Sequence, residues 1–321
     1  MADLALVLVM AVWGSSFSIL RFFLSGAGGD ATRAASPLAL VAARMALSSL
    51  LLLAWLGVRP QGRAQLRQLF APGALAPGGV VRDGLVCGAL LAGGFLLQSE
   101  GLPRTTASRS GFLTGLLVAF VPLLEYLLFR KRPAPPALVA LALAVAGMSL
   151  LSGSFSAPLA GVDTLAGDLL TVGCAVVFAA HILALGRVAS RHPLALLLLL
   201  QLACTGLAAA ALGPLVEPGH LPRSAALWSA IVYLALFATL LAFGIQTWAQ
   251  RVVTPVRIAL LSALEPVFAA LWAALLLGER LSAAEKAGGG LIVLGVVIGE
   301  AGAAWWARRA GRNLGPPLRP G

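Results

Sequence analysis

The segment FLLQSEGLPRTTASRSGFL at residues 95–113 is matched, 148 positions later and without a gap, by FGIQTWAQRVVTPVRIALL at residues 243–261. Identities between leucines carry little weight in a leucine-rich chain, whereas a glutamine and an arginine that recur in one register carry more. The match therefore indicates an internal repeat, which is the first feature to look for in a sequence. The paired residues are Phe95 and Phe243, Gln98 and Gln246, Thr106 and Thr254, Arg109 and Arg257, Leu113 and Leu261, Phe120 and Phe268, Arg132 and Arg280, and Gly147 and Gly295.

The composition of the chain is that of a membrane protein. Of its 321 residues, 60% are apolar or aromatic and only 11% are charged, whereas a soluble domain carries about 25% charged residues. Such a chain cannot cover a globular surface with solvated side chains, and intrinsic disorder requires the opposite composition. The net charge of +11 comes from basic residues between apolar runs. We therefore expect a lipid bilayer, and no nucleic acid, around this chain.

Ten apolar runs bounded by charged residues, Pro or Gly follow one another along the chain. Each run is long enough to cross the bilayer as a helix of about 20 residues, and a helix satisfies its own backbone hydrogen bonds in lipid. We expect an all-α, polytopic membrane protein with ten transmembrane helices. The runs fall at about 3–25, 37–57, 81–102, 107–129, 134–153, 167–187, 193–215, 224–249, 256–277 and 283–303.

The two halves predict an inverted repeat. Near the start of each half the offset becomes 165 positions, so that Asp3 matches Asp168 and Trp13 matches Phe178. Five spans are an odd number, and two homologous halves in series therefore cross the membrane in opposite senses. Inverted repeats around a midplane site are typical of secondary transporters. We expect a first five-helix repeat at 1–153, an inter-repeat loop at 154–166, a second five-helix repeat at 167–303 and a basic cytoplasmic tail at 304–321.

The basic residues predict that both termini are cytoplasmic, because cytoplasmic loops carry an excess of Lys and Arg. Residues 3–24 lack the basic start of a signal peptide and exceed its apolar region of about 7–15 residues, so we interpret them as a retained first span. The expected location is the cytoplasmic (inner) membrane, crossed many times. This orientation places Arg59, Arg63, Arg67, Arg82, Arg130, Lys131, Arg132, Arg187, Arg191, Arg251, Arg308, Arg309, Arg312 and Arg319 inside, and Arg33, Arg104, Arg223, Arg280 and Lys286 outside.

Several short segments carry a family resemblance. Residues 11–17 read AVWGSSF, residues 43–45 read ARM, and residues 264–271 read LEPVFAAL; LGERL at 277–281 and GLIVLG at 290–295 follow. In this order and spacing the whole chain resembles the EamA type of the drug/metabolite transporter superfamily. The resemblance implies a ten-helix exporter or exchanger of small metabolites that works by alternating access, without a cofactor. It does not fix the substrate.

One departure limits that resemblance. Residues 129–132 read FRKR where such units often carry a Gly-Glu-Arg sequence. A role for that glutamate therefore does not transfer to the first half.

Polar and aromatic residues within the spans are the candidates for a substrate site. Trp13, Ser16 and Phe17 share one helical face, and Phe178 and His181 are their counterparts on the sixth span. The alternatives are ordinary aromatic packing, a Ser16 hydroxyl bonded to its own helix, and a His181 that is a satisfied interior histidine. The predicted substrate-binding set is Trp13, Ser16, Phe17, Gln98, Phe178, His181 and Gln246.

Charged residues at membrane depth form a second group of candidates. A charge near the bilayer centre costs about 2.5–3.5 kcal/mol, so it is expected to face the bundle interior. Arg44 and Glu265 are assigned either to proton coupling or to a structural ion pair, and Pro266 loosens the helical turn before it. Arg109 and Arg257 lie near helix starts, where snorkelling to the interface is the default interpretation.

The predicted function is a secondary transporter, an exporter or exchanger, of small organic metabolites such as amino acids. A channel or a membrane scaffold is the alternative, and an intramembrane enzyme has less support because no GxSxG, HExxH or Walker sequence is present. The three cysteines lie in apolar runs without metal-ligand spacing, so no metal site is expected. Two GxxxG spacings, at Gly111 and Gly295, favour packing within the bundle over a dimer face, and we expect a monomer or weak homodimer.

Overall fold

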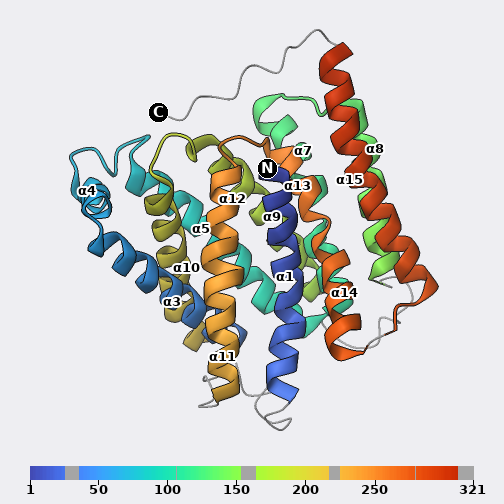
Figure 1. Cartoon of the computed structure of the whole chain (residues 1–321), viewed down its shortest axis with the longest axis horizontal. Coiled ribbons are helices and arrows are strands. Elements are labelled where there is room, and N and C mark those ends of the chain that lie inside the picture. Colours follow the sequence, from blue (N-terminus) through green and yellow to red (C-terminus); the bar gives the residue numbers. More distant parts are fainter. Residues whose placement is uncertain (26–35, 106, 153–163, 217–224, 279, 310–321) are drawn as a thin grey trace.

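A computed structural model describes residues 1–25, 36–105, 107–152, 164–216, 225–278 and 280–309. Every element in this part of the chain is a helix, which confirms the all-α prediction (Figure 1). Parts of the expected inter-repeat loop and basic tail lie outside the described residues, as does the side chain of Phe17.

The helices follow the predicted apolar runs closely. The first half contains α1 (Ala2–Ser25), α3 (Pro37–Val58), α4 (Pro60–Arg67), η1 (Gln68–Phe70), α5 (Val80–Gly101), η2 (Leu102–Arg104), α6 (Ala107–Gly115), α7 (Leu117–Phe129) and α8 (Pro135–Leu151). The second half contains α9 (Thr164–Val188), α10 (Leu194–Val216), α11 (Ala225–Tyr233), the π-helical segment η3 (Leu234–Leu241), α12 (Ala242–Ala249), α13 (Pro255–Ser262), α14 (Glu265–Leu277) and α15 (Ala283–Arg309).

Local chemistry sets several helix boundaries. Pro37, Pro135 and Pro255 each occupy the first helical position, where the missing N–H removes no hydrogen bond. The Ser36 hydroxyl accepts a hydrogen bond of 3.1 Å from the Ala39 amide and caps α3. At Gly278 the backbone has a φ of +69°, which ends α14.

Seven helical segments are long and apolar enough to cross a membrane, which supports a multi-pass membrane protein. Two shorter apolar helices, Ala2–Ser16 and Pro135–Leu151, accompany them. The seven segments are Pro37–Val58, Val80–Arg104, Arg109–Phe129, Leu165–Val188, Leu194–Leu215, Ala225–Ala249 and Pro255–Leu277. The total of ten spans stays a prediction.

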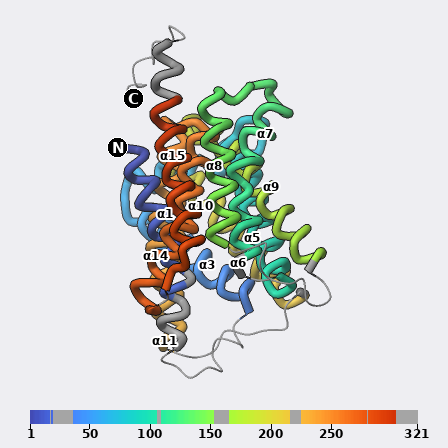
Figure 2. Tube along the Cα trace, turned by 90° about the vertical axis from the view of Figure 1, so that its right-hand side faces the viewer, coloured from blue at the N-terminus to red at the C-terminus, as the bar shows by residue number. Residues whose placement is uncertain are grey.

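Two tightly packed helix pairs form the edges of the bundle. The α8–α15 pair lies at one edge and the α3–α10 pair at the other, with α1, α5, α9 and α12 between them (Figures 1 and 2). A Cβ atom at Gly295 of α15 would lie 2.8 Å from the Ala140 carbonyl of α8, so the backbones approach closely there. This GxxxG glycine therefore packs within the bundle, as the sequence favours.

Three apolar clusters fill the described interior, and the two larger ones meet at α1. Of these two, one contains Val121, Ile182 and Leu261, the other contains Met45 and Leu202, and the half-buried Trp13 packs against both. The indole of Trp13 thus lies at the boundary between the two clusters.

Candidate functional site

Four aromatic rings from four helices gather in the centre of the bundle. The ring centroids of Trp13 on α1 and Phe243 on α12 are 5.2 Å apart, and those of Phe95 on α5 and Phe178 on α9 are 5.5 Å apart in an edge-on arrangement. Phe95 and Phe243 join the two pairs at 6.4 Å. These distances are those of favourable aromatic contacts. We call Trp13, Phe95, Phe178 and Phe243 the aromatic cluster.

The guanidinium group of Arg44 on α3 lies against this cluster. Its central carbon is 4.8 Å from the centroid of the Phe95 ring, which is a cation–π contact. The Nε atom is buried and has no hydrogen-bond partner among the described residues. Within the same part of the chain, none of the ion pairs involves Arg44. An aromatic face therefore stabilises this interior cation where a carboxylate would be expected.

Glu265, the other charged candidate, begins α14 and is half-buried. It forms no ion pair with Arg44, and no hydrogen bond to its carboxylate is found among the described residues. The static pair between the two residues, one of the roles left open by the sequence, is therefore absent from this conformation. A role of Glu265 in proton coupling stays a prediction.

The π-helical segment η3 supplies backbone acceptors to the neighbouring helices. The Trp13 indole donates a hydrogen bond of 2.8 Å to the carbonyl of Ala238, and the Ser48 hydroxyl donates one of 2.8 Å to the carbonyl of Ala235. Wide π-helical turns are frequent at functional sites. Here the wide segment fixes the orientation of Trp13 against the aromatic cluster.

Two of the predicted polar residues are satisfied locally. The His181 Nε2 atom is 2.7 Å from the Gln201 side-chain oxygen, and the Gln201 amide donates to the Leu197 carbonyl at 3.0 Å. His181 is buried and has the environment of a satisfied interior histidine. The Ser16 hydroxyl donates to the Val12 carbonyl of its own helix at 3.3 Å. The two residues follow Phe178 and Trp13 by three positions on α9 and α1, and the hydrogen bonds found for them are to neighbouring helix groups.

A row of buried polar residues without partners runs along η3 and α12. Thr239, Gln246, Thr247 and Gln250 are all buried, and each has a side-chain polar atom that makes no hydrogen bond within the described part of the chain. Buried polar atoms are normally paired, so such a row calls for a solute or water. Gln246 belongs to the predicted site, whereas its repeat counterpart Gln98 is half-buried on α5.

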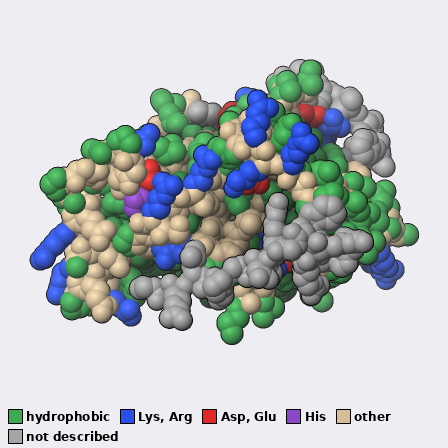
Figure 3. Space-filling view, turned by 90° about the horizontal axis from the view of Figure 1, so that it is seen from above, with side chains coloured by type: hydrophobic (Ala, Val, Ile, Leu, Met, Phe, Trp, Pro, Cys, Tyr) green, Lys and Arg blue, Asp and Glu red, His purple; other side chains and the backbone are tan. Residues whose placement is uncertain are grey.

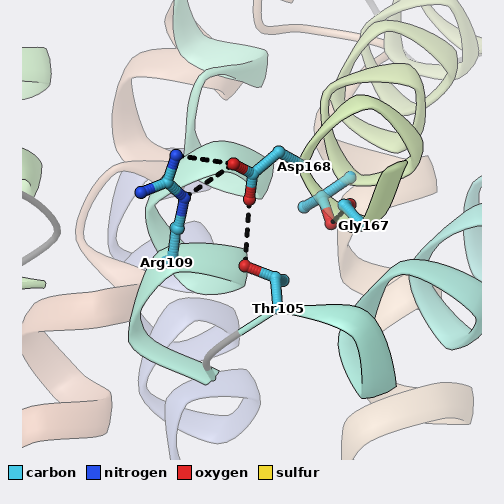
Figure 4. Close-up of polar contacts among 5 residues, drawn as sticks. Thr105, Arg109, Gly167 and Asp168 are labelled. Carbon is cyan, nitrogen blue, oxygen red and sulfur yellow. Dashed lines mark hydrogen bonds and ion pairs between the residues drawn. The ribbon is translucent and has the colours of Figure 1, made fainter. Parts of the chain in front are cut away.

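Two clusters of charge lie at opposite ends of the bundle. Near the start of α9, the Arg109 guanidinium donates to one carboxylate oxygen of Asp168 at 2.7 and 2.6 Å, and the Thr105 hydroxyl donates to the other at 2.9 Å (Figure 4). Near the N-terminus, Arg257 donates to Asp3 at 2.9 Å and to Glu300 at 2.7 Å. Arg109 and Arg257 lie at the two ends of the bundle, and each forms an ion pair there; their expected snorkelling to the interface stays a prediction.

A model of the EamA-like transporter family matches residues 1–153 and 165–299. The chain belongs to this family. That result confirms the resemblance noted from the sequence and, with the apolar helices, a membrane transporter.

One curated relative and one solved structure are similar to this EamA-family chain. An uncharacterized transporter of Archaeoglobus fulgidus is 26% identical over 297 residues, covering 92% of this chain and 85% of the relative. A crystal structure titled only as that of a protein superposes with a TM-score of 0.74 and 21% identity, covering 96% of this chain and 98% of the other. The second likeness shows the fold alone.

The structure also brings forward residues that the sequence did not place in the site of this EamA-family chain. Phe95 and Phe243 were used only as markers of the repeat, yet they join the aromatic cluster. Thr239 and Thr247 gave no signal, because single threonines are common in apolar helices. For the phenylalanines the signal was available: each recurs next to a repeated glutamine at equivalent positions in the two halves.

Proposed function

We propose that this EamA-family protein is a secondary transporter of small organic solutes such as amino acids, working by alternating access around a midplane site between its halves. The aromatic cluster around Arg44 is the observation that carries the proposal. It draws Trp13 and Phe95 from the first half and Phe178 and Phe243 from the second. A site shared by two halves is what alternating access requires, since rocking of one half against the other exposes it to each side in turn.

The halves are proposed to be inverted repeats of five helices each, at 1–153 and 167–303. The aromatic pairs support this relation: the offsets of 165 and 148 positions convert Trp13 and Phe243 into Phe178 and Phe95, and both pairs are in contact. A two-fold relation between halves produces such an exchange, whereas random leucine-rich similarity does not.

The ion pairs support the same relation. The two offsets convert Asp3 and Arg257 into Asp168 and Arg109, and each acid contacts the base of the opposite half. Asp3 lies by the N-terminus at one end of the bundle, and α6, which carries Arg109, lies toward the other end (Figure 2). Two ion pairs between the halves at opposite ends suit alternating access. The pair at one end can break to open that end while the pair at the other end stays formed and keeps it closed.

The membrane orientation is part of the proposal. We place the protein in the cytoplasmic membrane with both termini cytoplasmic, on the basis of the excess of Lys and Arg in the loops on that side. The residues equivalent by repeat, Arg132 and Arg280, then lie on opposite faces. Single cysteines at these positions in a background free of Cys87, Cys174 and Cys204 are expected to react with an impermeant thiol reagent from opposite sides. Reaction from the same side contradicts the inverted repeat.

The chemistry of the site favours a solute with a carboxylate and an apolar part. Arg44 offers guanidinium donors that no described acid occupies, and carboxylates are the natural partners of such donors. Phe95 stacks on this guanidinium, and Phe178 and Trp13 continue the apolar surface through their contacts with Phe95 and Phe243. A neutral or zwitterionic amino acid with an apolar side chain satisfies both features.

Counterflow into proteoliposomes that contain the full chain tests the proposal. Saturable exchange of apolar amino acids is expected, and Arg44→Gln is expected to raise the KM at least about tenfold, because it removes a charged hydrogen bond. Arg59→Gln, at the residue that directly follows α3 and stacks on Trp55, serves as the matched control and is expected to retain transport. Flux without saturation indicates a channel, and covalent change of the solute indicates an enzyme. Exchange restricted to phosphorylated solutes contradicts the amino acid assignment.

A further inference from the structure

A cavity of about 430 Å³ lies at the end of the bundle, well apart from the aromatic cluster. It opens where α3 ends and α10 begins, and its lining includes Trp55, Gln65, Arg191, His192 and Arg251. Trp55 and Arg44 are both on α3 and are separated by about 16 Å along its axis, at the helical rise of 1.5 Å per residue. The cavity is therefore distinct from the proposed transport site.

The cavity is lined by basic residues, and some buried polar atoms of its lining have no hydrogen-bond partner among the described residues. Arg251 donates a hydrogen bond of 2.7 Å to the His192 carbonyl, but its Nε atom is buried without a hydrogen-bond partner among the described residues. The buried side-chain oxygen of Gln65 also lacks one within that part of the chain. Burial lowers the pKa of Arg251 below its ordinary value, the direction expected for a cation that has lost water without gaining an acid.

An acid that contacts the lining residue His192 is already paired. Asp83 at the start of α5 is 2.9 Å from the Nε2 atom of His192, and both side chains are buried. Asp83 forms no ion pair with Arg191 or Arg251 in the described part of the chain. Two guanidinium groups consequently line one cavity, and no carboxylate of the described residues forms an ion pair with either.

The position of the cavity indicates which anion reaches it. Trp55 at its mouth is 47% exposed and stacks under Arg59 at 4.3 Å, an arrangement typical of the headgroup level of a bilayer, where tryptophan and arginine gather. Lys and Arg side chains are spread over the face of the molecule that carries α4 and the N-terminus (Figure 3). Basic pockets between helices at this level bind phosphate-containing lipid headgroups.

We propose that this cavity binds the phosphate group of an anionic phospholipid, with Arg191 and Arg251 donating to the phosphate oxygens and Trp55 packing beside the glycerol backbone. Arginine suits this role because its planar group can engage two phosphate oxygens together. A lipid held there would join the end of α3 to the loops that precede α10 and α13.

The test uses the full-length protein in detergent, titrated with phosphatidylglycerol or with phosphatidylcholine of the same acyl chains. Bound lipid is counted by native mass spectrometry, and the thermal unfolding midpoint is followed in parallel. We expect selective retention of phosphatidylglycerol, weakened about fivefold by Arg191→Gln. Arg67→Gln removes one positive charge from exposed α4 outside the cavity lining and is expected to leave retention unchanged. Because Arg251 also holds the His192 carbonyl, Arg251→Lys is used beside Arg251→Gln to keep the charge.

Three results overturn the proposal. Equal retention of the two lipids, or equal losses for Arg191→Gln and Arg67→Gln, shows that only general surface charge is involved. Displacement of phosphatidylglycerol by millimolar inorganic phosphate, together with stabilisation by phosphate alone, assigns the cavity to a soluble phosphate compound. Full retention in both Arg191→Gln and Arg251→Gln shows that the guanidinium groups do not bind the headgroup.

Discussion

The two ends of the bundle carry the same pair of residues in different surroundings. The Arg109 and Asp168 side chains are 28% and 12% exposed. They form an ion pair, and Asp168 also accepts a hydrogen bond from the Thr105 hydroxyl. At the other end Arg257 and Asp3 are 43% and 42% exposed, and the arginine is shared with a second acid, Glu300. The repeated pair of residues thus determines which side chains form the ion pair at each end. Local burial determines how much that ion pair contributes to the free energy of unfolding.

Replacing the buried acid is expected to give the largest effect. Asp168→Asn removes the carboxylate that pairs with the partly buried Arg109 guanidinium, and we expect the free energy of unfolding to fall by about 2 kcal/mol. This is less than the 3–5 kcal/mol lost when fully buried pairs are broken, because water reaches Arg109. Denaturant titration in detergent measures the change. A loss below about 0.5 kcal/mol shows that this end resembles an ordinary surface pair.

The close approach of α9 to η2 makes the same end sensitive to one methyl group. A Cβ atom at Gly167 would lie 2.8 Å from the backbone carbon of Arg104, so Gly167→Ala is expected to destabilise the protein by about 1–2 kcal/mol. The position equivalent by repeat is already alanine, Ala2, which marks a further difference between the two ends.

A control on the same helix separates this clash from the intrinsic effect of alanine. A Cβ atom at Gly173 would meet only a leucine methyl group, Leu97 Cδ1, at 3.6 Å. Gly173→Ala is therefore expected to be neutral or to stabilise α9 by up to about 1 kcal/mol. If Gly167→Ala and Gly173→Ala unfold at the same denaturant concentration, the close approach of Gly167 to Arg104 does not determine the stability of this end.

The hydroxyl group of Thr105 is expected to contribute less than the charge it supports. Thr105→Val removes the hydrogen bond to Asp168 Oδ1 while preserving the shape of the side chain, and a loss of about 1 kcal/mol follows. In the Asp168→Asn background the same substitution is expected to cost less, because the two groups share one network. Additive losses in the double variant contradict a shared network.

Sequence patterns could predict the elements because apolar runs bounded by Pro and Gly leave helices few alternatives. Pro37, Pro135 and Pro255 begin helices where expected. The sequence also contained the signal for the ion pairs: Asp3 and Arg109 each recur with their charge in the other half. That the acid of one half contacts the base of the other could not be read from it, because spacing along one chain does not say which helix ends meet.

The candidate site was predicted less completely for the same reason. Trp13 was placed in it from helical periodicity and Phe178 as its repeat counterpart, and both belong to the aromatic cluster. Arg44 was considered mainly as a partner of Glu265, yet it lies on the Phe95 ring. A cation–π contact between α3 and α5 depends on tertiary packing, so no local sequence pattern predicts it.

The smallest effect is expected at the exposed end. Asp3→Asn leaves Arg257 bound to Glu300, and exposed ion pairs contribute about 0–1 kcal/mol, so the free energy of unfolding is expected to change by less than about 1 kcal/mol. The change is also expected to shrink further in 0.5 M salt, because screening acts most strongly on exposed charges. Asp168→Asn, the same substitution at the equivalent position, is the matched reference and keeps most of its larger loss in salt. An equal, salt-resistant loss for the two variants removes the distinction between the ends, since burial would then have no influence on the strength of the repeated pair.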